Sequence, residues 1–249
     1  MAASVSLRSY LLVTTLPKSK RTLILRLPDI DLSHTWNIHE LPWEEFHHSS
    51  KKKFYYDMVT SLDDDLLAAL RPHLADISPE KSESGRKVHQ KTALAFLYLL
   101  LSLGSPKFPG CMYTLRSTIP IDAGVGSSAY REEARLQMEC VNRWAFVFEM
   151  CIHGNPSGVD NTCSTQGKGV VFQKPDDQKP SLVKSLWNFP ELPLLLVDTK
   201  QAKSTAVELG KVQRLEKFQT TLGGDGIGVL WPAVSRNGLD EYEEGWHGD

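Results

Sequence analysis

The first forty residues contain two short apolar runs separated by a basic segment. Tyr10 to Leu16 and Thr22 to Leu27 are rich in Leu, Ile, Val and Thr, and residues 17–21 between them combine a proline with three basic residues. Apolar and branched residues bounded by a turn are typical of strands. The pattern predicts two strands that pair with each other through a basic turn, and Trp36 to Ile38 predicts a further short strand.

Two helices are predicted in the next stretch. Ser61 precedes three aspartates and a series of leucines spaced for one helix face, which predicts a helix from about residue 61 to Leu74. A second helix is predicted from Lys87 to Leu103. Its apolar run, residues 92–103, is too short for a membrane span of ~20 residues, so a buried core helix is expected.

The second half of the chain mixes strand and helix patterns. Apolar residues between 134 and 152 recur in steps of four and three, which is typical of an amphipathic helix. The predicted apolar stripe of that helix is Ala134, Met138, Val141, Ala145, Phe148 and Ile152. Strands are predicted at 112–118, 170–173, 193–198 and 226–230, and a further helix at 204–217. Because strands and helices do not alternate as βαβ units, the fold class predicted is α+β.

Composition and charge narrow the functional classes only slightly. The 249 residues carry a formal charge of -2, which gives the whole chain no general attraction to nucleic acid or to an anionic membrane. The N-terminus shows no basic region followed by an apolar run, so a secretory signal is not expected. Four cysteines without CxxC spacing indicate reduced thiols in a cytoplasmic protein, and a zinc site is not expected.

The glycine- and serine-rich loop at residues 119–129 carries the strongest chemical signal. It follows a predicted strand and precedes a helix expected to begin near Ser127 or Ser128. Its glycines let the backbone approach a bulky anion, and the first turn of a helix offers unpaired N–H groups at the positive end of its dipole. A serine there can cap the helix or reach a phosphate-bound Mg²⁺. By itself the loop fits either a phosphate site or an ordinary turn with a serine cap.

A second group of chemically interesting residues comprises Glu149 and the segment His153 to Asn161. Glu149 and His153 are four residues apart and therefore share a helix face. Glu149 could hold a metal or simply be solvated. Asp160 follows a turn that contains Gly and Pro, where it could cap a helix or accept a proton from a substrate hydroxyl. The spacing alone leaves these alternatives open.

Together the two segments resemble a pattern of the GHMP small-molecule kinases. That pattern reads P-x-G-A-G-L-G-S-S-A and later W-A-F-x-x-E-x-x-I-H-G-N-P-S-G-V-D-N, and the chain is similar to it at residues 120–129 and 144–161. The second string resembles that of mevalonate kinases in particular. Residues 2–13 resemble the family strand after its first motif, and residues 194–205 resemble the strand and loop that close over the site.

The resemblance implies ATP-dependent phosphorylation of mevalonate to 5-phosphomevalonate in the cytoplasm, a step of isoprenoid and sterol synthesis. It implies a GHMP-kinase N-terminal domain of the ribosomal protein S5 domain 2-like type, with no nucleic-acid or membrane partner, and it leaves a homodimer open. The roles that it implies are ATP phosphate binding by Gly124, Val125, Gly126, Ser127 and Ser128, Mg²⁺ binding by Ser128 and Glu149, proton abstraction by Asp160, and substrate contact by Thr205.

The chain departs from the family pattern in four places. The opening lysine and Gly-Glu-His motifs have no counterpart, and Asp122 replaces a glycine beside the phosphate loop. Like charges ~4 Å apart repel by about 4 kcal/mol at an effective dielectric constant near 20, so Asp122 disfavours ATP. The pattern breaks after Ala129 and resumes near Val141, and a helical second half is missing after Val212. We therefore expect residues 1–212 to form a partial N-terminal domain that holds the phosphate loop and the Asp160 loop, and residues 213–249 to be a remnant of the C-terminal strand and tail.

These departures leave three functions open. The chain could be an active mevalonate kinase, a catalytically inactive relative that acts, if at all, as a binding protein, or a kinase of the same fold with another substrate. The missing second half would otherwise bury an apolar face of the first half. Its loss therefore predicts exposed apolar patches and marginal stability.

Overall fold

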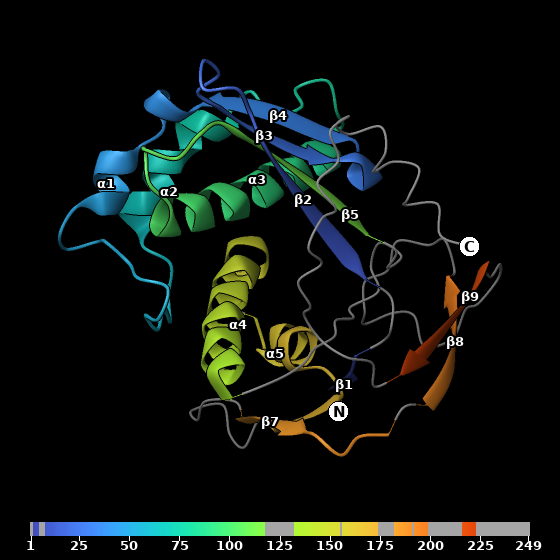
Figure 1. Cartoon of the computed structure of the whole chain (residues 1–249). Helices are drawn as coiled ribbons and strands as arrows, with labels where there is room; N and C mark the ends of the chain where they lie inside the picture. The colour runs from blue at the N-terminus through green and yellow to red at the C-terminus, as the bar shows by residue number, and fades with distance from the viewer. Residues whose placement is uncertain are drawn as a thin grey trace.

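The computed structural model describes residues 2–4, 8–117, 132–154, 156–173, 182–190, 192–198 and 216–222 of the chain. Within them, helices and strands are mixed as an α+β fold (Figure 1). The strands are β1 (Ala2–Ala3), β2 (Ser9–Thr15), β3 (Thr22–Leu27), β4 (Leu32–Asn37), β5 (Cys111–Ser117), β6 (Gly169–Gln173), β7 (Leu182–Leu186), β8 (Leu192–Asp198) and β9 (Glu216–Leu222). The α-helices are α1 (Trp43–His47), α2 (Asp64–Leu70), α3 (Glu83–Leu103), α4 (Glu132–His153) and α5 (Val159–Gln166), and the 3-10 helices are η1 (Pro28–Ile30), η2 (Ile38–Glu40) and η3 (Arg71–Leu74).

The main sheet has the strand order β2-β5-β3-β4. β5 pairs antiparallel with β2 and parallel with β3, so it lies between the two strands that the sequence predicts to be direct neighbours. The predicted strands are confirmed, but their pairing is wrong, because β5 supplies ladder partners to both and comes from a distant part of the chain. β3 pairs on its other side with β4, which is longer than predicted.

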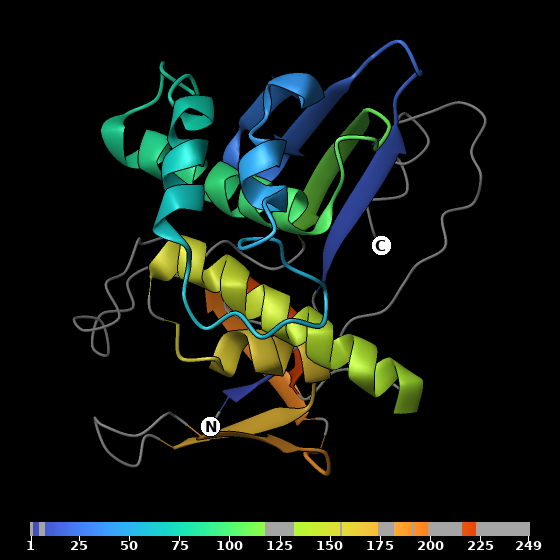
Figure 2. The same ribbon diagram turned by 90° about the vertical axis from the view of Figure 1, so that its left-hand side faces the viewer.

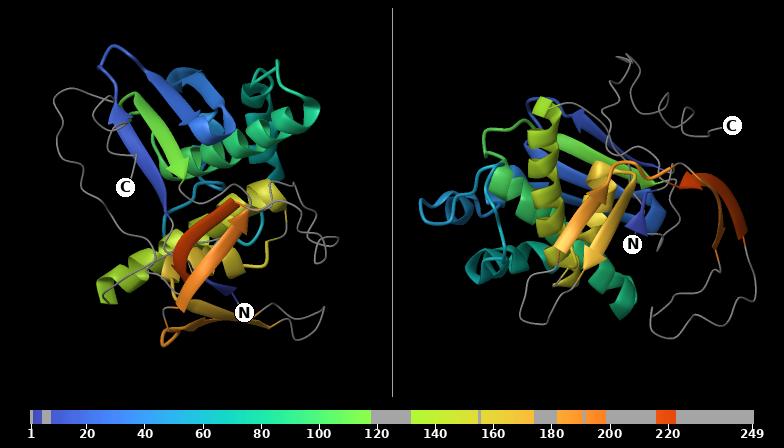
Figure 3. Two further views of the ribbon diagram at one scale, coloured as in Figure 1. Left: turned by 90° about the vertical axis from the view of Figure 1, so that its right-hand side faces the viewer. Right: turned by 90° about the horizontal axis from the view of Figure 1, so that it is seen from below.

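Beyond the main sheet, the structure forms two smaller groups of strands. β1, β6 and β7 make a three-stranded sheet, and β8 and β9 make an antiparallel pair (Figure 3). The segment at residues 2–13 therefore contributes to two sheets rather than to one strand, and β7 was not predicted. The helix predicted at 204–217 is wrong at Glu216 and Lys217, which belong to β9. The remainder of that helix and the strand predicted at 226–230 lie outside the described residues.

The elements stack in layers (Figure 2). The main sheet carries α3 on one face, α4 packs on α3, α5 packs on α4, and the small sheet of β1, β6 and β7 packs on α5. Of the helices in the described ranges, none is long and apolar enough to cross a membrane. The layering places the α4–α5 junction in the middle of the molecule.

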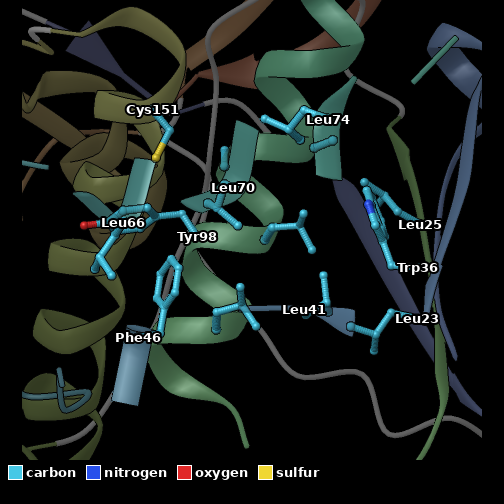
Figure 4. Packing of buried hydrophobic residues seen from close by; sticks show 14 of the residues in the cluster. Leu23, Leu25, Trp36, Leu41, Phe46, Leu66, Leu70, Leu74, Tyr98 and Cys151 are labelled. Carbon is cyan, nitrogen blue, oxygen red and sulfur yellow. The ribbon is translucent and has the colours of Figure 1, made fainter. Parts of the chain in front are cut away.

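The hydrophobic core lies between the main sheet and α1, α2 and α3 (Figure 4). Leu23 and Leu25 of β3 face Trp36 of β4, while Phe46 of α1 and Tyr98 of α3 meet edge to face with 5.6 Å between ring centroids. All five side chains are buried. Burial of each such side chain stabilises the fold by about 1.5–3 kcal/mol. The same cluster extends into α4, so the sheet and the α4–α5 junction share one core.

The face of α4 that is most buried differs from the predicted stripe. Trp144, Val147 and Cys151 are buried in the core, whereas Val141 is 44% exposed and Phe148 is half-buried. Neighbouring residues are about 100° apart around a helix, so the true stripe is rotated by roughly one residue. α4 contacts α3 on one side and α5 on the other, and apolar residues therefore occur on both faces. The helix is confirmed and its stripe is corrected.

Several large apolar side chains are exposed. The strongest case is β2, an edge strand within the described part of the main sheet, where Leu11 is 59% and Val13 is 49% exposed. Leu136 on α4 and Tyr55 in the loop before α2 are also exposed. Leu11 and Val13 are two residues apart and so lie on one face of the strand.

α2 begins with an aspartate cap rather than at Ser61. Asp63 accepts hydrogen bonds from the backbone N–H groups of Asp65 and Leu66, and it also binds Lys51 Nζ at 2.7 Å. The hydrogen bond from Lys51 is the main reason that the pKa of Asp63 lies below its ordinary value. The α-helix ends at Leu70, and the chain continues as the 3-10 helix η3 because Pro72 cannot donate a backbone hydrogen bond.

Asp63→Ala is expected to lower the free energy of unfolding by about 1 kcal/mol, because it removes the N-cap of α2. Urea denaturation followed by circular dichroism measures the change. Asp63→Asn is the matched control, since its amide oxygen can still cap the helix. Equal losses in both variants would mean that the Lys51 ion pair, not the cap, stabilises this region.

Candidate active site

Two glycines with positive φ shape the turn between α4 and α5. Gly154 (φ +79°) ends α4, and its N–H donates to the carbonyl of Met150 at 2.9 Å. Gly158 (φ +79°) is the N-cap of α5. L-residues with side chains are strained at such angles, so glycine is required at both positions. Between them Ser157 Oγ accepts a hydrogen bond from the N–H of Val159 at 3.3 Å. The described residues at both ends of the turn are therefore held by local contacts.

This turn delivers Asp160 to the first turn of α5. Asp160 is the second residue of the helix and is exposed, and Gly158 occupies the cap position without a side-chain hydrogen bond. The alternative that Asp160 is an N-cap is therefore wrong. A carboxylate in the first turn is favoured by the positive end of the helix dipole. Its oxygens remain available to a ligand, and no ion pair to Asp160 occurs within the described ranges.

Glu149 lies across from Asp160 on the penultimate turn of α4. Its side chain is half-buried, and the nearby backbone N–H of Asn161 lowers the pKa of its carboxyl, against the larger effects of burial and of Asp160. Burial, followed by the nearby charge of Asp160, raises the pKa of Glu149 from its ordinary 4.5 to about 7. The structure thus brings together the two carboxylates that the sequence singled out. His153, which was expected on the same face of α4 as Glu149, ends the helix and is exposed.

A cavity of about 610 Å³ opens beside Glu149, between α3, α4 and α5, and Asp160 is not among the described residues that line it. Glu149, Asn161 and Ser164 supply polar groups at its wall. Most of the remaining wall is apolar and comes from Leu99, Leu103, Val141, Trp144, Ala145 and Phe148. Its volume is in the range of small-molecule sites, and an apolar wall with a few polar groups is typical of them.

The remaining residues expected at the site are outside the described part of the chain. These residues are Asp122, Gly124, Val125, Gly126, Ser127, Ser128 and Thr205. The phosphate-binding and substrate-binding roles assigned to them therefore stay predictions.

The described residues fit part of a magnesium site. Mg²⁺ is typically bound by one or two carboxylates together with nucleotide phosphates and waters. Glu149 and Asp160 place two carboxylates close enough for their charges to interact, and a divalent cation would relieve that repulsion. The described part of the chain contains no group of three acidic, His or Cys side chains that could hold a metal. Further ligands would have to come from the nucleotide, from water or from Ser128.

Two cysteines near this site do not act as nucleophiles. Burial is the main cause that raises the pKa of Cys163 to about 11 and that of Cys151 to about 12, and the charge of Asp160 also contributes at Cys163. Both thiols therefore stay protonated at neutral pH and are poor nucleophiles. Neither of them forms a disulfide bond.

The sequence reasoning missed the part that two asparagines play in holding this site. Asn161 belongs to the motif that contains Asp160, but no role was assigned to it. Asn142, its partner on α4, has no motif around it and could only be found from the contacts of the folded chain. A polar residue close to the predicted apolar stripe of α4 was the one available signal.

Glu149→Gln is expected to stabilise the protein increasingly as the pH rises. Between pH 4.5 and about 7 the folded state holds a proton on Glu149 that the unfolded state has lost, so wild-type stability falls as the pH rises through this window. Glutamine does not titrate and escapes this loss. Urea denaturation at pH 5 and pH 8 should show the advantage of the variant growing by roughly 1–2 kcal/mol, after allowance for partial exposure of the carboxylate.

Glu139→Gln is the control for that measurement, because Glu139 lies on the same helix but is exposed and paired with Arg143. An advantage of Glu149→Gln that does not grow between pH 5 and pH 8 would show that Glu149 is already ionised in the folded state at pH 5.

The similarity to known proteins is extensive. No protein-family model matches the chain. The chain is 60% identical to a mevalonate kinase of Gibberella zeae over an alignment that covers 98% of the chain and 75% of that relative. It is 59% identical to a mevalonate kinase of Aspergillus fumigatus, with 87% of the chain and 45% of the relative covered. It is 36% identical to a mevalonate kinase of Candida albicans, with 86% and 55% covered.

The lengths of these alignments matter for the interpretation. The Gibberella alignment runs over 383 positions, 134 more than the 249 residues of the chain, so stretches of that relative have no counterpart here. The chain spans about half the length of the Aspergillus and Candida relatives. The resemblance inferred from the motifs at 120–129 and 144–161 is confirmed, and the chain belongs to the mevalonate kinase family, whose members are phosphotransferases.

Proposed function

We propose that the chain phosphorylates mevalonate with ATP and Mg²⁺, giving 5-phosphomevalonate and ADP. The observation that carries the proposal is the pair formed by half-buried Glu149 and exposed Asp160 at the α4–α5 junction. Enzymes separate the roles of two carboxylates by giving them different environments. The similarity to mevalonate kinases supports mevalonate as the substrate and ATP as the phosphoryl donor.

Asp160 is the proposed general base toward the substrate hydroxyl. It lies in the first turn of a helix begun by a rigid turn, and its carboxylate is open to solvent. A base must reach the proton that it takes, and an exposed carboxylate at a fixed backbone position can do so. Proton removal makes the hydroxyl oxygen a better nucleophile toward the γ-phosphoryl group.

Glu149 is the proposed protein ligand of Mg²⁺, together with Ser128. When bound, the ion would neutralise charge on the transferred phosphoryl group. The nearby N–H of Asn161 lowers the pKa of Glu149 and so favours the ionised form, which is the form that binds a cation. Gly124, Val125, Gly126, Ser127 and Ser128 are proposed to hold the ATP phosphates, and Thr205 to contact the substrate.

The finer details of architecture are also proposals. We propose that residues 1–212 correspond to a GHMP-kinase N-terminal domain of the S5 domain 2-like type and residues 213–249 to a C-terminal remnant. A cytoplasmic location and a homodimer fit the family. The α+β arrangement and the 60% identity support this interpretation.

The test is ADP release by the purified chain. Turnover should require both mevalonate and Mg²⁺, and ³¹P NMR should detect 5-phosphomevalonate. Galactose, homoserine and phosphomevalonate serve as the substrate panel, and turnover with one of them in place of mevalonate would indicate another kinase of the same fold. No turnover with any substrate, together with no increase in melting temperature on addition of Mg-ATP, would favour the catalytically inactive relative.

A further inference from the structure

Two asparagines join α4 to α5 through hydrogen bonds between their side chains. Asn161 Nδ2 donates to Asn142 Oδ1 at 2.7 Å and to the backbone carbonyl of Asn142 at 3.2 Å. Asn142 Nδ2 in turn donates to Thr162 Oγ1 at 3.3 Å. Asn161 is only 5% exposed, so water does not compete for its bonds. We call these three hydrogen bonds the Asn142–Asn161 clasp.

The main chain of Asn161 is fixed as firmly as its side chain. Its carbonyl accepts the hydroxyl of Thr165 at 2.7 Å, and its N–H is close enough to Glu149 to lower the pKa of that carboxyl. Asn161 also follows Asp160 directly in the chain. A displacement of Asn161 would therefore move Asp160 and the N–H beside Glu149 together.

α5 depends on such a contact because the helix is short and its N-cap residue supplies no side-chain hydrogen bond. It has eight residues, and its glycine N-cap provides no side-chain hydrogen bond. An isolated helix of this length is unstable in water, so tertiary contacts must set its orientation. The clasp lies in its first turn, where a side-chain cap would otherwise act.

The clasp also leaves one polar atom unpaired. Within the described ranges, Asn161 Oδ1 is buried without a hydrogen-bond partner. Burial of an unpaired carbonyl costs about 1–3 kcal/mol, which an apolar side chain of similar size would avoid. The asparagine side chain must therefore do more than fill space. The contacts show what it does: it donates two hydrogen bonds to Asn142.

We propose that Asn161 is a positioning residue that, through its clasp with Asn142, fixes the Asp160 carboxylate relative to Glu149. The inference rests on the proposed function, in which these two carboxylates are the base and the magnesium ligand. Reacting groups must be held closely, and a displacement of about 1 Å can reduce the rate by ~10²-fold. The clasp acts through Asp160 and Glu149 and is not itself in contact with substrate.

The test compares Asn142→Ala with Asn142→Asp in the full chain. The alanine removes the 2.7 Å acceptor for Asn161, whereas the aspartate keeps an acceptor oxygen at the same place. Hydrogen exchange of the backbone amide of Asn161 is read by NMR or mass spectrometry. We expect exchange at least tenfold faster in Asn142→Ala and within twofold of wild type in Asn142→Asp, with α3 amides unchanged. An unchanged exchange rate in Asn142→Ala would contradict the proposal that the clasp holds Asn161 in place. So would an equal increase in the exchange rates of the α3 amides.

Kinetics supply the second measurement. Asn142→Ala should lower kcat at least tenfold while the KM values for ATP and mevalonate change less than threefold, and Asn142→Asp should restore most of kcat. A parallel loss in both variants would overturn the positioning role. If the wild-type chain gives no turnover, the proposed function fails, and the exchange comparison still decides whether Asn142 holds Asn161 in place.

Discussion

Asp160→Asn is expected to reduce mevalonate-dependent ADP release by about 10²–10⁴-fold while leaving the protein folded. The amide has the same shape as the carboxylate but cannot accept the hydroxyl proton, and general-base catalysis typically contributes this factor. Because Asp160 is exposed and forms no ion pair within the described ranges, its replacement should change the melting temperature little. Steady-state kinetics with a coupled ADP assay measure the rate, and thermal denaturation confirms the fold.

Two comparisons make this result specific. Glu139→Gln neutralises an exposed carboxylate on α4 that is paired with Arg143, away from the proposed chemistry, and should retain kcat within twofold. Mg-ATP binding should also survive Asp160→Asn, because the base acts on the alcohol and not on the nucleotide. Turnover that persists in Asp160→Asn would exclude Asp160 as the general base.

The second large effect is expected for the core. Tyr98→Ala should lower the free energy of unfolding by about 3–5 kcal/mol, the usual cost of deleting a buried aromatic ring. Tyr98 is 1% exposed and packs edge to face against Phe46 at 5.6 Å. Since small domains are stable by only about 5–15 kcal/mol, the variant should be largely unfolded well below the wild-type melting temperature. Urea denaturation at 15 °C measures the difference.

Tyr98→Phe distinguishes the contribution of the aromatic ring to stability from that of the hydroxyl group, because it removes only the hydroxyl. The hydroxyl oxygen accepts a long hydrogen bond, 3.4 Å, from the N–H of Asp63, so its loss should cost no more than about 1 kcal/mol. A loss of several kcal/mol in Tyr98→Phe would mean that the hydroxyl, rather than the ring, organises the contact between α2 and α3.

Local sequence signals predicted the individual elements well, because those signals act over a few residues. Leucine and threonine runs marked β2 and β3, and the apolar run up to Leu103 marked α3. The sheet order could not be predicted in the same way. Whether β5 inserts between β2 and β3 depends on contacts across some ninety residues, and no local pattern encodes that pairing.

The error in the α4 stripe has a different origin. Single-face reasoning assumes a helix with one apolar and one polar side. α4 lies between α3 and α5, so Trp144 and Val147 can be buried while Phe148 also faces other side chains. In a helix packed on two sides, hydrophobic spacing predicts helix formation but not the direction of greatest burial.

The candidate site was partly predictable. Gly158 and the residues around it indicated a tight turn, and that turn does deliver Asp160 to a helix start near Glu149. The raised pKa of Glu149 could not be predicted, because it depends on burial and on the nearby charge of Asp160, which only the folded structure shows. The Asn142–Asn161 clasp is likewise a product of helix packing.

The exposed apolar face of β2 has a practical consequence for handling the protein. Leu11 and Val13 are exposed on one face of this strand, and exposed apolar surface favours association with another molecule. The apparent molar mass measured by light scattering should therefore increase with protein concentration. Leu11→Lys should suppress the self-association, because the ammonium group would lose its hydration in a contact between two molecules.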